Sequence, residues 1–117
     1  MKTVLLDTNF LLLPFERRID VFEGVERLLE EPVQFVVLKE CLDEARASRL
    51  FKSVEAMVAK KARVVSAGKG KPDDLILSWA KENGAVVCTA DARLRIRLKK
   101  LGVPVILLKG ESRLDFA

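Results

Sequence analysis

Short apolar runs alternate along the chain with segments that carry helical patterns, and this alternation constrains the fold more than any other feature. The runs are rich in Val, Leu and Ile, which is typical of strands covered on both faces. Strands that alternate with helices form parallel sheets with right-handed crossovers. We expect strands at residues 4–6, 34–38, 62–67, 85–89 and 103–108.

The segments between the runs predict helices from their periodicity and their end signals. We expect a short helical turn before Pro14 and helices at residues 19–30, 40–61, 72–83 and 91–101. The helix over 40–61 has no glycine or proline, and we expect a break in it between Ser48 and Ser53. The tail from Gly110 to Ala117 has no clear assignment.

The predicted fold is a three-layer α/β/α domain that takes up residues 1–117. Its central sheet is expected to have five parallel strands in the order 3-2-1-4-5. In such a sheet the first and fourth strands are neighbours at the topological switch point, where ligands bind beyond the carboxyl ends of the strands.

The composition excludes several classes of chemistry. The chain has no histidine, so it cannot hold a Ser-His-Asp triad, a Cys-His pair or a histidine zinc site. Cys41 and Cys88 lie in apolar surroundings without CxxC spacing, and we interpret them as buried free thiols. No apolar run approaches the length of a membrane span, so we expect a cytoplasmic protein without membrane contact.

Acidic residues stand where predicted strands end or helices begin. Asp7 follows the first run, Asp43 and Glu44 follow the second, Asp73 and Asp74 open the helix before the fourth, and Asp91 follows the fourth. The strand order predicts that Asp7 and Asp91 face each other across the switch point. Glu44 and Asp73 are expected to reach the same edge.

Each acid also has a purely structural interpretation. Asp7 and Asp91 can cap helices, Asp73 and Asp74 can complement a helix dipole, and Glu44 can belong to a solvated helix face. All of these acids are expected at one edge of the sheet, which favours a common function for them over separate structural roles. Two carboxylates about 4 Å apart repel by roughly 4 kcal/mol at an effective dielectric constant near 20.

A cluster of this kind requires protonation or a bound cation. Oxygen ligands without histidine or thiolate favour Mg²⁺ or Mn²⁺, which also accept phosphate oxygens as ligands. Such ions activate water and stabilise the leaving oxygen in phosphodiester hydrolysis. The residues therefore indicate metal-dependent hydrolysis that needs no histidine base.

The chain resembles the PIN-domain family, which is related to the 5′-nuclease superfamily, over essentially its whole length. The matching stretches are LLDTN at 5–9, VVLKECLDEA at 36–45, PDDLILSWA at 72–80 and VVCTADARLRIRL at 86–98. Within the family it is most similar to archaeal relatives of small-subunit ribosomal-RNA processing proteins, and less so to toxins of VapBC-type pairs.

The resemblance places the family's catalytic and metal-binding acids on Asp7, Glu44, Asp73 and Asp91. It implies that Asn9 and Thr89 support them by hydrogen bonding. The stretch before Glu44 departs from the family pattern, which leaves Glu40 and Asp43 open as alternatives to it. Asp74 adjoins Asp73 and could share its role.

The resemblance further implies a Mg²⁺- or Mn²⁺-dependent endoribonuclease that cleaves single-stranded RNA, such as a ribosomal-RNA precursor, and forms a homodimer. An antitoxin or a ribosome-assembly factor would be a further partner. The net charge is +4. We expect the basic residues near the acids to bind RNA, namely Lys69, Lys71, Arg93, Arg97 and Lys100.

Two other phosphoryl-chemistry classes fit less well. A receiver domain needs an acid at the end of its third strand, where this chain reads ARVVSAG. A haloacid-dehalogenase-type phosphatase needs a second acid two residues after Asp7, where Asn9 stands. The serious alternative is an RNA-binding assembly factor with the nuclease fold and little or no activity, because fold alone does not fix function.

Overall fold

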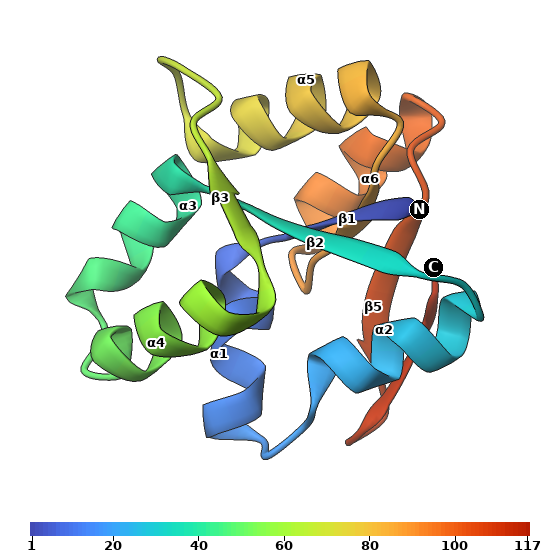
Figure 1. Ribbon diagram of the computed structural model, residues 1–117. Coiled ribbons are helices and arrows are strands. Elements are labelled where there is room, and N and C mark those ends of the chain that lie inside the picture. The colour runs from blue at the N-terminus through green and yellow to red at the C-terminus, as the bar shows by residue number, and fades with distance from the viewer.

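The computed structural model describes residues 1–117 and is built on a six-stranded sheet of order β3-β2-β1-β4-β5-β6 (Figure 1). The first five strands are parallel, and the sixth is antiparallel to the fifth. Their bounds are β1 (Lys2–Leu6), β2 (Val33–Leu38), β3 (Arg63–Val65), β4 (Val86–Cys88), β5 (Val105–Lys109) and β6 (Arg113–Phe116).

Helices connect the strands and cover both faces of the sheet. They are α1 (Thr8–Glu16), α2 (Val21–Leu29), α3 (Lys39–Glu44) with the 3₁₀ turn η1 (Ala45–Ala47), α4 (Phe51–Lys61), α5 (Pro72–Asn83) and α6 (Ala92–Lys100). Figure 1 shows α1, α2 and α4 on one side of the sheet and α5 and α6 on the other. Each helix falls short of the length and apolarity that a bilayer crossing requires.

The two faces of the sheet bury separate apolar layers. Val4 and Leu6 of β1 pack with α1, α2 and α4, and Leu5 between them packs with α5 and α6. All three side chains are completely buried. A strand that is covered on both faces is apolar at every position, which explains why these runs are continuous rather than alternating.

The predicted three-layer fold and the strand order 3-2-1-4-5 are confirmed. The prediction of five strands is wrong, because residues 113–116 of the unassigned tail add β6 at the edge. Only Leu114 of this strand is buried, so its apolar pattern was too short to detect. Gly24 allows the close approach of β6 to α2, since a Cβ there would lie 2.8 Å from Leu114 Cδ1.

One helical prediction is wrong about where the helix ends, and another is confirmed. α1 continues through Pro14 to Glu16 instead of ending before the proline. The break in the 40–61 helix occurs where expected, between η1 and α4, and there Ser48 Oγ accepts a hydrogen bond from the Leu50 N–H at 3.0 Å. Cys41 and Cys88 are buried free thiols, as predicted.

The packing of β6 predicts that Leu114→Ala lowers the free energy of unfolding by about 2 to 3 kcal/mol, because it leaves a cavity against α2. Urea denaturation at pH 7 measures the change. Arg113→Ala, an exposed position of the same strand, is the matched control and should stay within about 0.5 kcal/mol of the wild type. A loss at Leu114 no larger than this would contradict the packing.

Candidate active site

Asp7 lies where β1 ends and α1 begins, and both elements hold it. Its backbone N–H donates to the Cys88 carbonyl at 3.0 Å, which continues the pairing of β1 with β4. Its side chain caps α1, since Oδ1 accepts a hydrogen bond from the Thr8 N–H at 2.7 Å. The residue is only 5% exposed. The fold therefore buries a carboxylate at the switch point.

A polar network joins Asp7 to the loop after β4. Its second oxygen, Oδ2, accepts hydrogen bonds from the Thr89 hydroxyl at 2.7 Å and from the Asn9 side-chain amide at 3.3 Å. Thr89 Oγ1 in turn accepts from the Asp91 N–H, and Asn9 Oδ1 accepts from the Ala90 N–H, both at 3.0 Å. Asn9 and Thr89 thus lie between the first and last acids, the position that sequence reasoning proposed for them.

Asp91 caps α6 and still keeps one oxygen free. Its Oδ1 accepts hydrogen bonds from the N–H groups of Arg93 at 2.8 Å and Leu94 at 3.1 Å. No group of the protein donates to its Oδ2. The helix cap therefore does not exclude a second role for this carboxylate.

Glu44 reaches the site from α3 by way of Thr8. The Thr8 hydroxyl lies 3.1 Å from Glu44 Oε1 and 2.9 Å from the Cys41 carbonyl oxygen. Carboxylate oxygens of Asp7 and Glu44 and the sulfur of Cys41 all lie within 4.8 Å of one another. Sequence reasoning did not assign a role to Thr8, because its reach to α3 depends on how two distant segments meet.

Asp73 completes the cluster from the first turn of α5. Burial raises the pKa of Asp73 above its usual value, and the charge of Asp91 raises it further, although Arg97 partly offsets both. Burial likewise raises the pKa of Asp7; hydrogen bonds from Thr89 and Thr8 oppose this shift, and the charges of Asp73 and Glu44 add to it. The four acids therefore act on one another electrostatically.

The remaining acids at this edge have partners elsewhere. Asp74 binds Arg97 with 2.7 Å between Oδ1 and Nη2, and Asp43 binds Arg46 at 3.1 Å. Glu40 accepts hydrogen bonds from Ser66 and Ala67. Of the alternatives that the sequence left open, Glu44 and Asp73 are therefore the ones that lie with Asp7, and Asp74 points to Arg97 instead.

None of the four clustered acids takes part in an ion pair. The ion pairs of the chain use Glu23, Asp43, Asp74 and Asp115 instead. A buried acid with a structural role normally has a basic partner or a full set of hydrogen bonds. The cluster thus has excess negative charge, and Arg97, whose charge acts on Asp73, is itself bound to Asp74.

Residues 4–111 match a family model described as a PIN like domain. The chain belongs to the PIN-domain family. A curated relative, the ribonuclease VapC4 of Methanocaldococcus jannaschii, is 30% identical over 123 residues, which cover 96% of this chain and 94% of that protein. This PIN domain is thus matched over almost its full length.

Two solved structures share the fold. The PIN domain endonuclease Utp24 has a TM-score of 0.81 at 21% identity, over 98% of this chain and 92% of that one. VapBC2 from Rickettsia felis, bound to a DNA fragment from its promoter, has a TM-score of 0.65 at 12% identity, over 92% of this chain and 99% of that one. At these identities the likeness concerns the fold alone.

The donors of the PIN-domain cluster fit a hard divalent cation. Asp7, Glu44, Asp73 and Asp91 offer carboxylate oxygens, the ligands that Mg²⁺ and Mn²⁺ prefer. The Cys41 thiol lies near them, but burial, together with the charges of Asp7 and Glu44, raises its pKa well above the usual range. Hard divalent cations prefer the carboxylate oxygens to this thiol, so the four acids form the favoured donor set.

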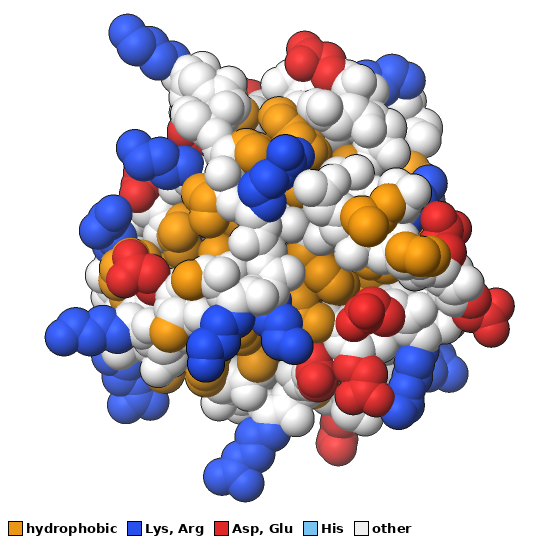
Figure 2. Space-filling model, in the orientation of Figure 1, with side chains coloured by type: hydrophobic (Ala, Val, Ile, Leu, Met, Phe, Trp, Pro, Cys, Tyr) orange, Lys and Arg blue, Asp and Glu red, His pale blue; other side chains and the backbone are white.

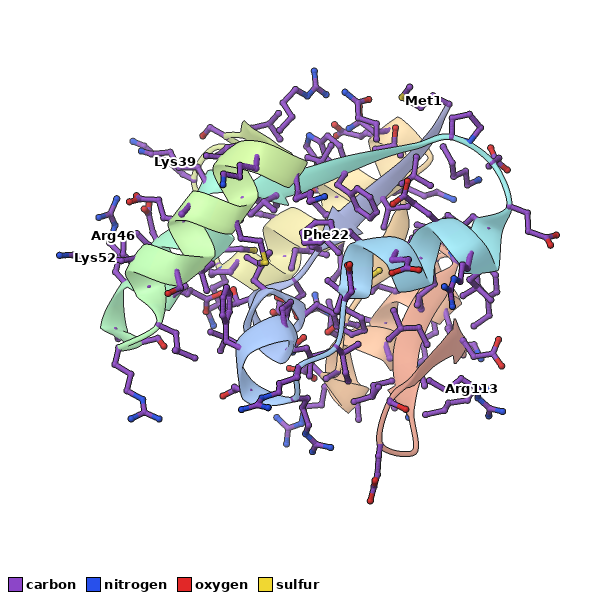
Figure 3. All side chains as sticks on the ribbon, turned by 60° about the horizontal axis from the view of Figure 1, so that its bottom comes forward. Met1, Phe22, Lys39, Arg46, Lys52 and Arg113 are labelled. Atoms are coloured by element: carbon purple, nitrogen blue, oxygen red, sulfur yellow. The ribbon has the colours of Figure 1, made fainter.

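Basic side chains lie next to the acids in sequence on two segments. Lys69, Lys71 and Arg93 are exposed and form no ion pair, whereas Arg97 is held by Asp74. Lys100 is also exposed, but it ends α6 before β5 and thus lies at the opposite edge of the sheet from Asp91. Figure 2 shows Lys and Arg gathered over α3, α4 and the loop after β3, with acids gathered over α2. In Figure 3, Lys39, Arg46 and Lys52 project from the same side of the molecule.

The electrostatics of the cluster predict that Asp7→Asn is no less stable than the wild type at pH 7 in EDTA, and more stable by up to about 1 kcal/mol. Because the pKa of Asp7 is raised in the folded state, protonation of Asp7 favours folding. This stabilisation is complete below the pKa that Asp7 has in the unfolded state. This contribution is lost as the pH rises through the folded-state pKa. The advantage of the variant should therefore shrink as the pH is lowered from 7 to 4.

Thermal unfolding in EDTA across this pH range measures the effect. Glu55→Gln removes an exposed acid that has no ion pair, and it should show no such trend. A loss of stability in Asp7→Asn at pH 7 would indicate that the hydrogen bonds accepted by Oδ2 from Thr89 and Asn9, which an amide nitrogen cannot accept, outweigh the repulsion among the acids.

Proposed function

We propose that this PIN domain, acting as one unit over residues 1–117, is a metal-dependent endoribonuclease that hydrolyses phosphodiester bonds of single-stranded RNA. The observation that carries the proposal is the gathering of carboxylates at one edge of the sheet. An Asp7 oxygen lies within 4.8 Å of a Glu44 oxygen, the charge of Asp73 acts on Asp7 and that of Asp91 acts on Asp73, and none of the four forms an ion pair. The similarity to the ribonuclease VapC4 over almost the whole chain supports the same activity.

Mg²⁺ or Mn²⁺ would be held by Asp7, Asp73 and Asp91, with Glu44 beside them. When bound, such an ion lowers the pKa of a coordinated water and stabilises charge on the phosphate and the leaving oxygen. The residues of the chain position these ligands. Thr89 and Asn9 hold the Asp7 carboxylate, and Thr8 links it to Glu44.

The exposed basic residues would bind the RNA backbone. Lys69 and Lys71 stand in the loop that leads into α5 and therefore flank Asp73, and Arg93 lies two residues after Asp91. Arg97 would contribute less, because Asp74 already binds its guanidinium. Contacts to phosphates do not depend on the base sequence of the RNA. We therefore propose that these side chains position single-stranded RNA rather than select its sequence.

Two biological settings fit the comparisons. One is the processing of a ribosomal-RNA precursor together with assembly factors, which the family resemblance implies; the PIN domain endonuclease Utp24 shares the fold. The similarity to VapC4 and to VapBC2 favours a toxin that is bound by an antitoxin. In either setting we propose that the chain acts as a homodimer.

The first test is cleavage of a labelled, circular single-stranded RNA with Mn²⁺ or Mg²⁺, since a substrate without ends reports only endonuclease activity. We expect Asp7→Asn and Asp91→Asn to lower the rate by about 100-fold or more, because each removes a ligand charge. Thr89→Val should lower it by about 10- to 100-fold through loss of its hydrogen bond to Asp7.

Glu55→Gln is the control for loss of an exposed acid and should cleave like the wild type. Equal cleavage by the wild type and both Asn variants would show a contaminating nuclease. That result, or binding of RNA without any cleavage, would instead favour the inactive assembly factor.

The second test concerns the RNA path and uses Asp7→Asn, which should bind RNA without cutting it. On single strands each phosphate contact adds about 0.7 to the slope of log affinity against log salt. We expect Lys71→Gln and Arg93→Gln each to reduce the slope by roughly this amount, measured by fluorescence anisotropy at several KCl concentrations.

Lys60→Gln is the matched control, because Lys60 lies at the end of α4, beside the amino end of β3 and thus at the opposite edge of the sheet. A reduction by Lys60→Gln as large as by the other two substitutions would argue for non-specific attraction. It would rule out the proposed path over the acids.

A further inference from the structure

Glu40 lies on the same short helix as Glu44 but has different partners. Its Oε1 accepts a hydrogen bond from the Ala67 N–H at 2.9 Å, and its Oε2 accepts one from the Ser66 hydroxyl at 2.8 Å. Both donors belong to residues 66–71, the segment between β3 and α5 that we call the approach loop. Both carboxylate oxygens of Glu40 are therefore used to hold this loop against α3.

The contact continues the pairing of β2 with β3 beyond the ends of the strands. Leu38 of β2 is in register with Val65 of β3. Glu40 and Ala67 each lie two residues further along their segments. Beyond the last paired residues of β2 and β3, the Glu40 side chain connects the same two segments by hydrogen bonds.

Besides Glu40, the approach loop is held by Ala67, which packs against the apolar layer beneath α5 and α6. Gly68 and Gly70 adopt φ angles of 102° and 142°, which glycine reaches without strain and which leave a permissive backbone. Apart from the contacts with Glu40, no hydrogen bond joins residues 66–71 to the sheet or to α3. Glu40 therefore accepts the only hydrogen bonds that join the loop carrying Lys69 and Lys71 to α3.

The loop also leads directly into the acid that is held least firmly. Asp73 follows it by two residues, and its side chain accepts no hydrogen bond from the protein. Asp7, Glu44 and Asp91 each accept at least one. Leu75 and Ile76 anchor the body of α5 in the core, but the first turn continues from the approach loop.

We infer that Glu40 is a positioning residue that latches the approach loop to α3 and thereby places Asp73, Lys69 and Lys71 relative to Asp7 and Glu44. The inference rests on the proposed function, because it assigns Glu40 to the same site. It predicts a role in metal and RNA binding without contact to either. The latch operates at neutral pH: although burial favours the neutral form, the hydrogen bonds from Ala67 and Ser66 lower the pKa of Glu40.

The experiment compares Glu40→Ala and Glu40→Gln with the wild type. Alanine removes both contacts. Glutamine retains them without the charge, since its oxygen can accept from the Ala67 N–H and its amide can donate to Ser66 Oγ. Glu55→Ala removes an exposed acid from the neighbouring α4 and serves as the matched control.

The first readout is limited trypsin digestion under native conditions, with cutting after Lys69 followed by mass spectrometry. The bond after Lys71 precedes Pro72 and resists trypsin. We expect Glu40→Ala to be cut about 10-fold faster or more, Glu40→Gln to lie much nearer the wild type, and Glu55→Ala to be unchanged. Unchanged cutting in Glu40→Ala would overturn the latch.

The second readout is Mn²⁺ affinity by calorimetry, together with RNA cleavage at saturating Mn²⁺. We expect Glu40→Ala to weaken Mn²⁺ binding and to raise KM for RNA, each by about 5- to 10-fold, with kcat within about twofold and Glu40→Gln largely restored. General loss of structure would instead lower kcat in both variants. Faster cutting by trypsin with unchanged Mn²⁺ and RNA binding would overturn the positioning role.

The two proposals fail in different ways. A wild-type protein that cleaves no RNA would refute the nuclease, and the digestion and calorimetry would still decide the role of Glu40. An active wild type with a Glu40→Ala variant that matches it in all readouts would refute only the inference about Glu40.

Discussion

The structure depends on one buried carboxylate. Asp7 ends the central strand and caps α1. It donates its N–H to the Cys88 carbonyl and accepts hydrogen bonds from Thr8, Asn9 and Thr89, while only 5% of the residue is exposed. These bonds offset part of the desolvation of the charge, and the neighbouring acids then add repulsion. The two apolar layers supply the stability that allows the site to keep this unfavourable arrangement.

Physical signals that repeat along the chain made most of the fold predictable. β1, β2 and β4 are covered on both faces, so their sequences are continuously apolar, and the right-handed crossover rule leaves few orders for the strands. In a doubly wound sheet of order 3-2-1-4-5, β1 and β4 are neighbours, so the residues that follow them, Asp7 and Asp91, lie at the same edge. The choice of Asp73 over Asp74 also followed from periodicity, since Leu75 and Ile76 fix which side of α5 faces the core.

The features that sequence reasoning missed depend on contacts between distant segments. β6 buries only Leu114, and it does so against a glycine of α2 that is far away in sequence. Thr8 contacts α3 and Glu40 contacts the approach loop only because the ends of β1, β2 and β3 lie side by side. Residue types and spacing specify which acids gather at the edge, but not which hydroxyl or backbone group each one meets.

The short helix α3 carries one residue of each kind. Glu44 was predicted at the site from the sequence, whereas the contact of Glu40 with the approach loop was not. Glu40 and Glu44 are four residues apart, so they project from the same side of α3, a helix of fewer than two turns. One holds the approach loop that precedes Asp73, and the other meets Thr8 beside Asp7. A shift of α3 would therefore move Glu44 and the approach loop together, whereas Asp7 and Asp91 are held by β1, Thr89 and the start of α6.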